Sequence, residues 1–356
     1  MWLLQYEFIL NASNLLVLHF RISIMKIAFF SAKPYDRIFF DQYNQSGEIE
    51  FHYFETALNS ESAKLTSDFD GVCVFVNDKI DRDTINELSA NNVKLIVLRC
   101  AGFNNIDLEA AQENNIRVLR VPAYSPEAIA EHAVALILTL NRKTHKAYNR
   151  IREGNFSLEN LVGFNLHGKT VGVIGTGGIG TAFIKVMLGF GCKVVAMDIK
   201  ESEELKQLGV MYDSLDDLLN ESDIISLHCP LNKTTHHLID SNAFSKMKRG
   251  VMLINTSRGA VINAPDAINA LKNGQLGYLG MDVYEQEEKL FSRDLSESII
   301  QDDVISRLMS FPNVLITAHQ GFFTNEALEQ IVLITLKNIN DFKNGNETAN
   351  EVILEK

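Results

Sequence analysis

The sequence has few cysteines, and their spacing argues against both a zinc site and a disulfide framework. Four occur among the 356 residues: Cys73, Cys100, Cys192 and Cys229. They are scattered, with no paired C-x-x-C spacing, so the sequence suggests neither a zinc site nor a disulfide framework. Three of them lie within or beside apolar runs. We therefore expect small buried thiols in a reducing compartment, a cytoplasmic location and no metal site.

Basic residues are fewer than acidic residues, and long hydrophobic runs are also lacking. The chain carries 33 lysines and arginines against 45 acidic residues, which gives a net charge of −12. This balance argues against nucleic acid or an anionic membrane as a main partner. No apolar run is long enough to span a bilayer, so we expect no membrane partner either.

The first 24 residues differ from the rest of the chain. Two apolar runs, Trp2–Leu4 and Leu15–Phe20, are broken by polar residues, and there is no basic start and no small-residue cleavage site. Met25 then opens a fresh strand pattern. We interpret residues 1–24 as a non-native N-terminal extension from a misplaced initiation codon. A peripheral membrane anchor is the alternative.

The sequence does contain one stretch with a complete order of strand, turn, helix, strand and acid. The β-branched run Thr170–Ile174 predicts a buried strand, and the loop GTGGIG follows at 175–180. An apolar helical pattern comes next, and a second strand, Lys193–Met197, ends on Asp198. This is the order that a dinucleotide site requires.

Each part of this stretch has a physical role in such a site. Gly175 allows the tight turn, Gly177 lets the backbone approach a pyrophosphate, and Gly180 lets the helix pack close to the strand. The helix N-terminus offers N–H groups and a partial positive charge to phosphates. Asp198 can accept hydrogen bonds from ribose hydroxyls and would repel a 2′-phosphate, so NAD is predicted over NADP. The alternative is a glycine-rich turn in another α/β unit.

Short apolar runs alternate with amphipathic stretches on both sides of this unit. Strand and helix patterns alternate between Met25 and Val121, and strand patterns recur at 223–227, 251–255, 278–282 and 314–317. Such alternation predicts parallel sheets with helices on both faces. The predicted fold class is therefore α/β, with two doubly wound parallel-sheet domains.

Two segments indicate how these domains divide. The two prolines of PAYSP at 122–126 cannot continue a strand or a helix, and a long apolar helix is predicted after them, over Glu127–Arg142. A last long helix, predicted over Asn325–Asn344, is well placed to return to the first sheet. We therefore predict a discontinuous substrate domain, 25–123 and 322–356, around a cofactor domain, 124–321.

Three charged residues follow predicted strands of the cofactor domain: Arg258, Glu287 and His319. Open parallel sheets bind ligands at the carboxyl ends of their strands, so we expect these residues near the cofactor. Ala101 and Gly102 follow a strand of the other domain. Their backbone N–H groups are expected across the same cleft.

These residue types suit one kind of chemistry. An arginine grips a carboxylate with two hydrogen bonds, a histidine gives or takes a proton near neutral pH, and a carboxylate fixes the tautomer of that histidine. The residues alone leave open that the arginine lies on the surface, the glutamate is only solvated and the histidine is structural. Four other histidines compete for the role of base: His132, His228, His236 and His237. His228 is the main rival, because it also follows a strand.

The motifs around these residues resemble those of the D-isomer-specific 2-hydroxyacid dehydrogenases and, within them, the fermentative D-lactate dehydrogenases. The matching motifs are RCAGFNNID at 99–107, VPAYSPEAIAEH at 121–132, GTGGIG at 175–180, SLHCPL at 226–231, NTSRGA at 255–260, GMDVYE at 280–285 and TAHQGFFT at 317–324. The resemblance runs from Met25 to about Leu354, and residues 1–24 have no counterpart in it. Gly178 stands where the family often has histidine or arginine, which should not impair binding.

The resemblance implies a role for each site residue. Arg258 would bind the substrate carboxylate, and Glu287 would orient and polarise the catalytic histidine, which would be His319 rather than His228. Four residues would contact the substrate: Ala101, Gly102, Tyr124 and Phe322. The dinucleotide would be lined by Gly175, Thr176, Gly177, Gly178, Ile179, Gly180, Asp198, Pro230 and Thr256. Asp282 is grouped with these cofactor-binding residues, and it would adjust the properties of the site from the side away from the substrate.

The resemblance also implies an activity and an assembly. A Rossmann cofactor domain would be inserted in a flavodoxin-like substrate domain. The reaction would be the reversible reduction of pyruvate to D-lactate by NADH, with His319 as general acid and base. Another small 2-keto acid is the alternative substrate, and an NADH-sensing corepressor that binds peptides is the alternative function. The family suggests a homodimer or higher homo-oligomer, for which the helix predicted over Glu127–Arg142 is a candidate surface.

Overall fold

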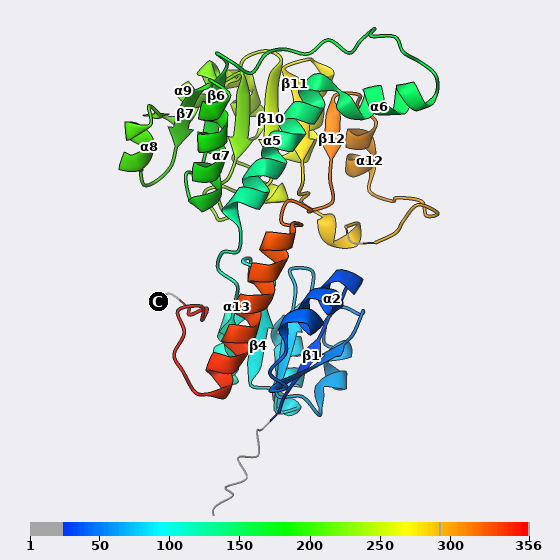
Figure 1. Ribbon diagram of the computed structural model, residues 1–356, viewed down its shortest axis with the longest axis vertical. Helices are drawn as coiled ribbons and strands as arrows, with labels where there is room; N and C mark the ends of the chain where they lie inside the picture. The colour runs from blue at the N-terminus through cyan, green and yellow to red at the C-terminus, as the bar shows by residue number, and fades with distance from the viewer. Residues whose placement is uncertain (1–23, 292, 355–356) are drawn as a thin grey trace, which may run out of the picture. The chain divides into compact units, whose positions relative to one another are not determined.

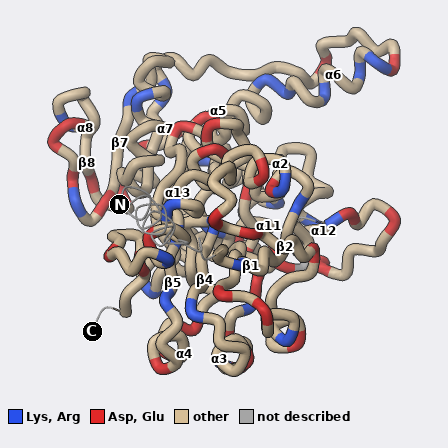
Figure 2. Tube along the Cα trace, turned by 60° about the horizontal axis from the view of Figure 1, so that its bottom comes forward, with Lys and Arg blue, Asp and Glu red and all other residues tan. Residues whose placement is uncertain are grey.

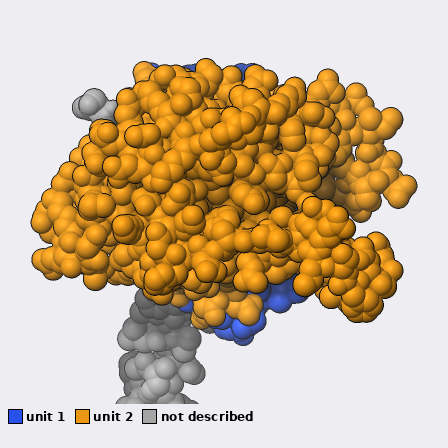
Figure 3. All heavy atoms as spheres, turned by 90° about the horizontal axis from the view of Figure 1, so that it is seen from above, with its two compact units in different colours: residues 1–122, 331–356 blue, residues 123–330 orange. Residues whose placement is uncertain are grey.

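The computed structural model describes residues 24–291 and 293–354, so nearly all of the predicted extension at 1–24 lies outside the described residues. The chain divides into two compact units (Figures 1 and 3). One runs to Pro122 and resumes at Ile331, and the other spans Ala123–Gln330. We predicted junctions at 123/124 and 321/322. The second boundary falls later, inside helix α13 (Asn325–Lys343).

The first unit is built on a five-stranded sheet in which all neighbouring strands are parallel, in the order β2-β1-β3-β4-β5. The strands are β1 (Met25–Phe29), β2 (Ile49–Tyr53), β3 (Gly71–Val74), β4 (Leu95–Leu98) and β5 (Arg117–Leu119). The helices are α2 (Pro34–Tyr43), η1 (Ser62–Thr66), α3 (Arg82–Ala90), α4 (Leu108–Glu113) and the later turns of α13.

Alternating side chains of these strands build a core on each face of the sheet. In β1, Ile27 and Phe29 belong to the core that includes Val332 and Ile339 of α13, whereas Ala28 belongs to the core on the α3 and α4 side. Both faces are apolar because helices cover both, which is typical of parallel sheets. Helix α13 thus returns to cover the first sheet, as its place in the sequence predicted.

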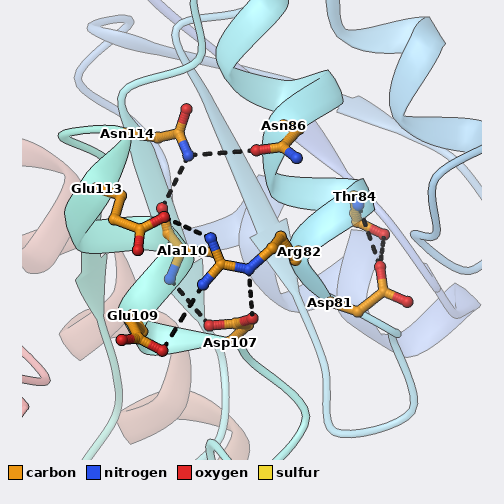
Figure 4. Close-up of polar contacts among 9 residues, drawn as sticks. All are labelled: Asp81, Arg82, Thr84, Asn86, Asp107, Glu109, Ala110, Glu113 and Asn114. Atoms are coloured by element: carbon orange, nitrogen blue, oxygen red, sulfur yellow. Dashed lines mark hydrogen bonds and ion pairs between the residues drawn. The ribbon is translucent and has the colours of Figure 1, made fainter.

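A charged cluster at the surface of this unit links α3 to α4 (Figure 4). Arg82 pairs with Glu113 and lies 3.6 Å from Asp107 and 3.7 Å from Glu109. Asp107 also begins α4 by accepting a hydrogen bond from the N–H of Ala110 at 2.9 Å. Ion pairs at such exposed positions add little stability. We interpret the cluster as a link between the start of α3 and helix α4.

The second unit is built on a seven-stranded parallel sheet in the order β12-β11-β10-β9-β6-β7-β8. The strands are β6 (Thr170–Ile174), β7 (Lys193–Met197), β8 (Met211–Tyr212), β9 (Ile224–Leu227), β10 (Val251–Asn255), β11 (Leu276–Met281) and β12 (Val314–Ile316). The helices are α5 (Pro126–Arg142), α6 (Thr144–Arg152), α7 (Gly178–Gly189), α8 (Glu203–Gln207), α9 (Leu215–Glu221), α10 (Ser241–Lys246), η2 (Gly259–Val261), α11 (Ala264–Lys272), η3 (Glu287–Lys289) and α12 (Asp303–Met309). The predicted α/β class with two parallel sheets is confirmed.

Local sequence explains where helix α5 begins and ends. The Ser125 hydroxyl accepts a hydrogen bond from the N–H of Ala128 at 3.3 Å, and Pro126 occupies the first turn. Lys143 ends the helix with a left-handed φ of 51°. Ala133 and Ile137 are fully buried in a core that also includes residues of α7 and β10. The apolar face of α5 is therefore already covered by its own unit.

Charged residues of both signs are interspersed along the chain, with no single basic stripe in the part that Figure 2 draws. All four cysteines are buried, as expected, and none forms a disulfide among the described residues. Among the helices of the described residues, none combines the length and the apolar character needed to cross a membrane.

Candidate functional site

The predicted site residues of the second unit follow strands of one sheet. They are Gly175–Gly180 after β6, Asp198 after β7, Pro230 after β9, Thr256 and Arg258 after β10, Asp282 and Glu287 after β11, and His319 after β12. Because the strands are parallel, their carboxyl ends form one edge of the sheet. The fold brings all of these residues to that edge.

His319 and Glu287 form a direct pair. The Nδ1 atom of His319 lies 2.7 Å from Oε1 of Glu287. The other carboxylate oxygen, Oε2, accepts a hydrogen bond from the backbone N–H of Tyr284 at 2.9 Å. A carboxylate held in this way keeps the proton on Nδ1 of the imidazole. The pair therefore leaves Nε2 of His319 as the atom that can exchange a proton with a ligand.

The segment that carries His319 is fixed by Asp282, which is only 2% exposed. Oδ1 of Asp282 accepts hydrogen bonds from the Thr317 hydroxyl at 2.6 Å and the Gln320 N–H at 2.9 Å, and Oδ2 accepts one from the Gly321 N–H at 2.7 Å. The N–H of His319 donates to the backbone oxygen of Asp282 at 2.7 Å. His319 has a left-handed φ of 53°, which is uncommon outside glycine and is kept here by these contacts.

His132, on helix α5, contacts the same carboxylate. Its Nε2 atom lies 3.0 Å from the Thr317 hydroxyl and 3.3 Å from Oδ1 of Asp282. Burial raises the pKa of Asp282, but hydrogen bonds from His132 and Thr317 outweigh it, so the net pKa is lowered. Asp282 is therefore ionised at neutral pH. We predicted His132 only as a rival base, because nothing in the sequence pattern connects α5 with the end of β11.

A tight turn after β10 sets the position of Arg258. The buried Asn255 donates from Nδ2 to the backbone oxygen of Arg258 at 2.9 Å, and its Oδ1 accepts a hydrogen bond from the Ser257 N–H at 3.0 Å. A Cβ at Gly259 would lie 2.0 Å from the backbone carbon of Tyr284, so only glycine fits there. Sequence reasoning missed both residues as supports of the arginine, although the NTSRG motif contains them.

The glycine-rich loop has the space and the turn that a pyrophosphate needs. Gly175 has a φ of 95°, and a Cβ there would lie 2.7 Å from the Cys229 nitrogen. A Cβ at Gly180 would lie 2.0 Å from the Gly175 oxygen. At Gly177 no described atom lies within 4 Å of the Cβ position, and no described side chain caps helix α7. These features fit a phosphate at the helix N-terminus.

Asp198 is held in place after β7. Its Oδ2 atom accepts hydrogen bonds from the Thr176 N–H at 2.5 Å and the Thr176 hydroxyl at 3.1 Å. The Tyr212 hydroxyl donates in turn to Thr176 Oγ1 at 3.0 Å. Burial raises the pKa of Asp198, but hydrogen bonds from Thr176 and from the Lys200 N–H outweigh it, so the net pKa is lowered. Sequence reasoning missed Tyr212, and it missed Ile199, whose apolar side chain is 99% exposed beside this carboxylate.

The remaining predicted cofactor residues lie around the same edge. Thr256 is buried, and its hydroxyl has no hydrogen-bond partner in the described part of the chain. Such an orphaned polar atom fits a site that a ligand completes. Ile179 lies in the first turn of α7, and Gly178 precedes it with its Cβ position 3.4 Å from Pro126. Pro230 is exposed after β9, and its carbonyl accepts a hydrogen bond from Thr235.

His228, the main rival for the role of base, is unsuited to it. Its Nε2 atom lies 2.9 Å from the Ser226 hydroxyl, and its buried Nδ1 has no partner among the described residues. Burial lowers the pKa of His228 to about 3. The ring is therefore neutral at physiological pH and is too weak a base to take up a proton. This favours His319 on physical grounds.

The four predicted substrate contacts belong to different units. Ala101 and Gly102 follow β4 in the first unit, where Arg120 donates to the Ala101 oxygen at 2.9 Å. Tyr124 and Phe322 belong to the second unit, with ring centroids 6.5 Å apart and planes at 74°. The roles of all four residues stay predictions.

The chain is similar to known proteins over most of its length. The sequence model of the D-isomer specific 2-hydroxyacid dehydrogenase NAD binding domain matches residues 134–321. The 2-hydroxyacid dehydrogenase A of Aspergillus oryzae is 53% identical over 336 residues, 93% of this chain and 96% of that protein. The D-lactate dehydrogenase of Escherichia coli is 50% identical over 329 residues, 92% of this chain and 100% of that protein. The solved pyruvate reductase of Chlamydomonas reinhardtii superposes with a TM-score of 0.88 at 43% identity, and covers 92% of this chain and 99% of its own.

Proposed function

Because the chain belongs to the D-isomer-specific 2-hydroxyacid dehydrogenases, we propose that it reduces pyruvate to D-lactate with NADH, and catalyses the reverse reaction with NAD⁺. The observation that carries the proposal is the pair of His319 and Glu287 at 2.7 Å, at the sheet edge where Arg258 also lies. The similarity to a D-lactate dehydrogenase and a pyruvate reductase supports the choice of substrate.

The nicotinamide, when bound, supplies the hydride for the carbonyl carbon. The residues of the chain then have to bind, orient and move one proton. Arg258 holds the substrate carboxylate with its planar guanidinium. Nε2 of protonated His319 donates a hydrogen bond to the ketone oxygen and gives it the proton. Glu287 stabilises the imidazolium before that transfer.

The cofactor residues act by shape and charge. The uncapped N-terminus of α7 and the open space at Gly177 accommodate the pyrophosphate. Asp198 accepts hydrogen bonds from the ribose, and Thr256 supplies a hydroxyl that has no other described partner. Both oxygens of Asp282 accept hydrogen bonds from the protein, so we assign it an indirect effect, through the backbone at 319–321.

A kinetic experiment tests the proposal. Purified protein is assayed by the loss of NADH absorbance with pyruvate and with larger 2-keto acids, and the product is resolved on a chiral column. We expect rapid turnover of pyruvate to the D-isomer. Turnover of only bulkier 2-keto acids would support the proposed mechanism but contradict pyruvate as the substrate. NADH binding without any turnover would refute the proposed reaction.

The assay should include the variant Glu287→Gln. The amide keeps the shape of the carboxylate but cannot stabilise an imidazolium, and a charge-assisted hydrogen bond contributes about 1.5–3 kcal/mol. We expect kcat/KM for pyruvate at neutral pH to fall by about 10–100-fold. An unchanged kcat/KM would remove Glu287 from the mechanism.

We also propose a cytoplasmic homodimer formed through the second unit. The surface we predicted, α5, is largely buried in its own unit, whereas α6 and the segment after it expose several apolar side chains. Phe156 is 74% exposed and Leu158 is 81% exposed. Light scattering on the wild type and on Phe156→Ser/Leu158→Ser tests the interface. A wild-type monomer would contradict the dimer, and a dimeric double variant would contradict this surface.

A further inference from the structure

Two imidazoles and one carboxylate gather outside the catalytic residues. His236 and His237 lie in the loop after β9, and Glu285 lies after β11. One donor atom from each side chain lies within 4.8 Å of the other two. The cysteine spacing led us to expect no metal site, but this set contains no cysteine, and its members are far apart in the sequence.

The distances resemble those of a metal site. Nε2 of His237 lies 3.3 Å from both oxygens of Glu285, and Nε2 of His236 lies 3.9 Å from Oε1. Zinc bonds of about 2.0–2.2 Å in a tetrahedron place neighbouring donor atoms about 3.3–3.6 Å apart. Small side-chain rotations would therefore bring the three donors to one ion.

The backbone turns both imidazoles to the same side. Consecutive side chains in an extended chain point in opposite directions, but His237 has a left-handed φ of 51°. The two rings consequently lie 4.0 Å apart, with their planes at 31°. The His237 N–H donates to the Ala260 oxygen at 2.8 Å, which helps to keep the turn in place. An uncommon backbone conformation that the surroundings maintain often marks a functional position.

The chemistry of the donors selects a class of ion. Among the described residues, the ion-pair partners of Glu285 are these two histidines, with no lysine or arginine to neutralise it. His236 and Glu285 are exposed and His237 is half-buried, so an ion can reach them from solvent. Imidazole and carboxylate donors suit Zn²⁺, Cu²⁺ and Ni²⁺, whereas Mg²⁺ prefers oxygen donors alone.

We propose that His236, His237 and Glu285 bind a divalent transition-metal ion of the Zn²⁺ class, with a fourth position open to water. None of the three residues belongs to the proposed dehydrogenase site. A bound metal would link the loop that follows Pro230 to the segment after β11, the connections that leave the two strands on either side of β10.

Asn263, which lies beside His237, affects which nitrogen of that imidazole can carry the proton when a metal is bound. Nδ2 of Asn263 lies 3.4 Å from Nδ1 of His237, and Oδ1 of Asn263 caps α11 by accepting the Asp266 N–H at 3.1 Å. Nδ1 of His237 therefore accepts a hydrogen bond while Nε2–H faces Glu285. A metal at Nε2 leaves the proton on Nδ1, where it needs an acceptor. Asn263→Asp supplies that acceptor and keeps a good helix cap.

Zinc titration of the untagged full chain tests the proposal. After treatment with a chelator, the wild type and the variants compete for Zn²⁺ with a chromophoric indicator at neutral pH. We expect one ion per wild-type chain, and at least tenfold weaker binding by His236→Ala and Glu285→Gln. Asn263→Asp should bind about tenfold more tightly, the lower end of the usual effect of such partners. Mg²⁺ should not compete.

His52→Ala is the matched control, because the His52 ring nitrogen pairs with a single carboxylate, that of Glu50. It should leave the zinc affinity unchanged. Absorption of the Co²⁺-loaded protein adds a second readout, since a four-coordinate site gives strong visible bands. Dehydrogenase activity of the metal-free variants checks that they are folded, and failure of the dehydrogenase proposal would not affect the zinc result. Equal zinc affinity of the wild type, His236→Ala and Glu285→Gln, or no binding by the wild type, would overturn the proposal.

Discussion

The substitution Asp282→Asn separates the positioning of His319 from its chemistry. The asparagine keeps the size of the side chain, and its oxygen can still accept hydrogen bonds from Thr317 and Gln320. Its amide group then takes the place of Oδ2, which accepts the Gly321 N–H at 2.7 Å in the wild type. Two N–H groups would face each other in a site where Asp282 is 2% exposed.

The size of the effect follows from these contacts. Loss of a charge-assisted hydrogen bond costs about 1.5–3 kcal/mol, and a buried N–H left without a partner costs about 1–3 kcal/mol. The two terms overlap, so we expect the free energy of unfolding to fall by about 2–4 kcal/mol. That is a large part of the 5–15 kcal/mol typical of a domain. A displaced Gly321 also moves His319, and a displacement of about 1 Å can cost about 100-fold in kcat/KM.

Urea unfolding and steady-state kinetics measure both effects. Leu219→Ala is the control: this leucine is 1% exposed in helix α9, and its truncation should cost about 2–5 kcal/mol. The control should lose stability and keep its kcat/KM at 25 °C, whereas Asp282→Asn should lose both. If Asp282→Asn kept the wild-type kcat/KM, Asp282 would not position His319.

The same variant gives a stability difference with a defined pH dependence. The pKa of Asp282 is lower in the folded chain than the value of about 3.9 expected when it is unfolded. The stabilisation is therefore complete above about pH 5 and is lost as the pH falls through the folded pKa. The gap in the free energy of unfolding between the wild type and Asp282→Asn should shrink as the pH falls below about 5. A gap that widens in acid would contradict the lowered pKa.

Three further substitutions test the other site residues. His319→Gln should lower kcat by about 10²–10⁴-fold with NADH affinity unchanged in a fluorescence titration, and a fall of less than tenfold would exclude it as the general acid. Arg258→Lys should raise KM for pyruvate about tenfold or more, because an ammonium cannot form the two parallel hydrogen bonds of a guanidinium, and an unchanged KM would mean that Arg258 does not hold the carboxylate. Asp198→Ala should lower the ratio of kcat/KM with NADH to kcat/KM with NADPH. An unchanged ratio would show that other residues determine the preference for NADH.

Strong local patterns made the main elements predictable. Strand β10 spans Val251–Asn255, as its apolar run predicted, and α5 begins one residue before its predicted start, at a serine cap and a proline. The motifs predicted the family and NAD as cofactor, and the comparisons confirm both. Shorter elements were not predicted. Strand β8 has two residues and helix α8 has five, which is too short for a period of 2 or 3.6 to stand out.

The sequence by itself determined the parallel α/β architecture, the glycine loop, and the identity of residues at strand ends, because each depends on neighbours within a few positions. Tertiary structure alone decided which distant residues meet. It placed His132 beside Asp282, gave His228 a burial that leaves it neutral, and brought His236 and His237 to Glu285. Chain spacing carries no information about such contacts, since they arise only when parallel strands align their carboxyl ends and helices pack across them.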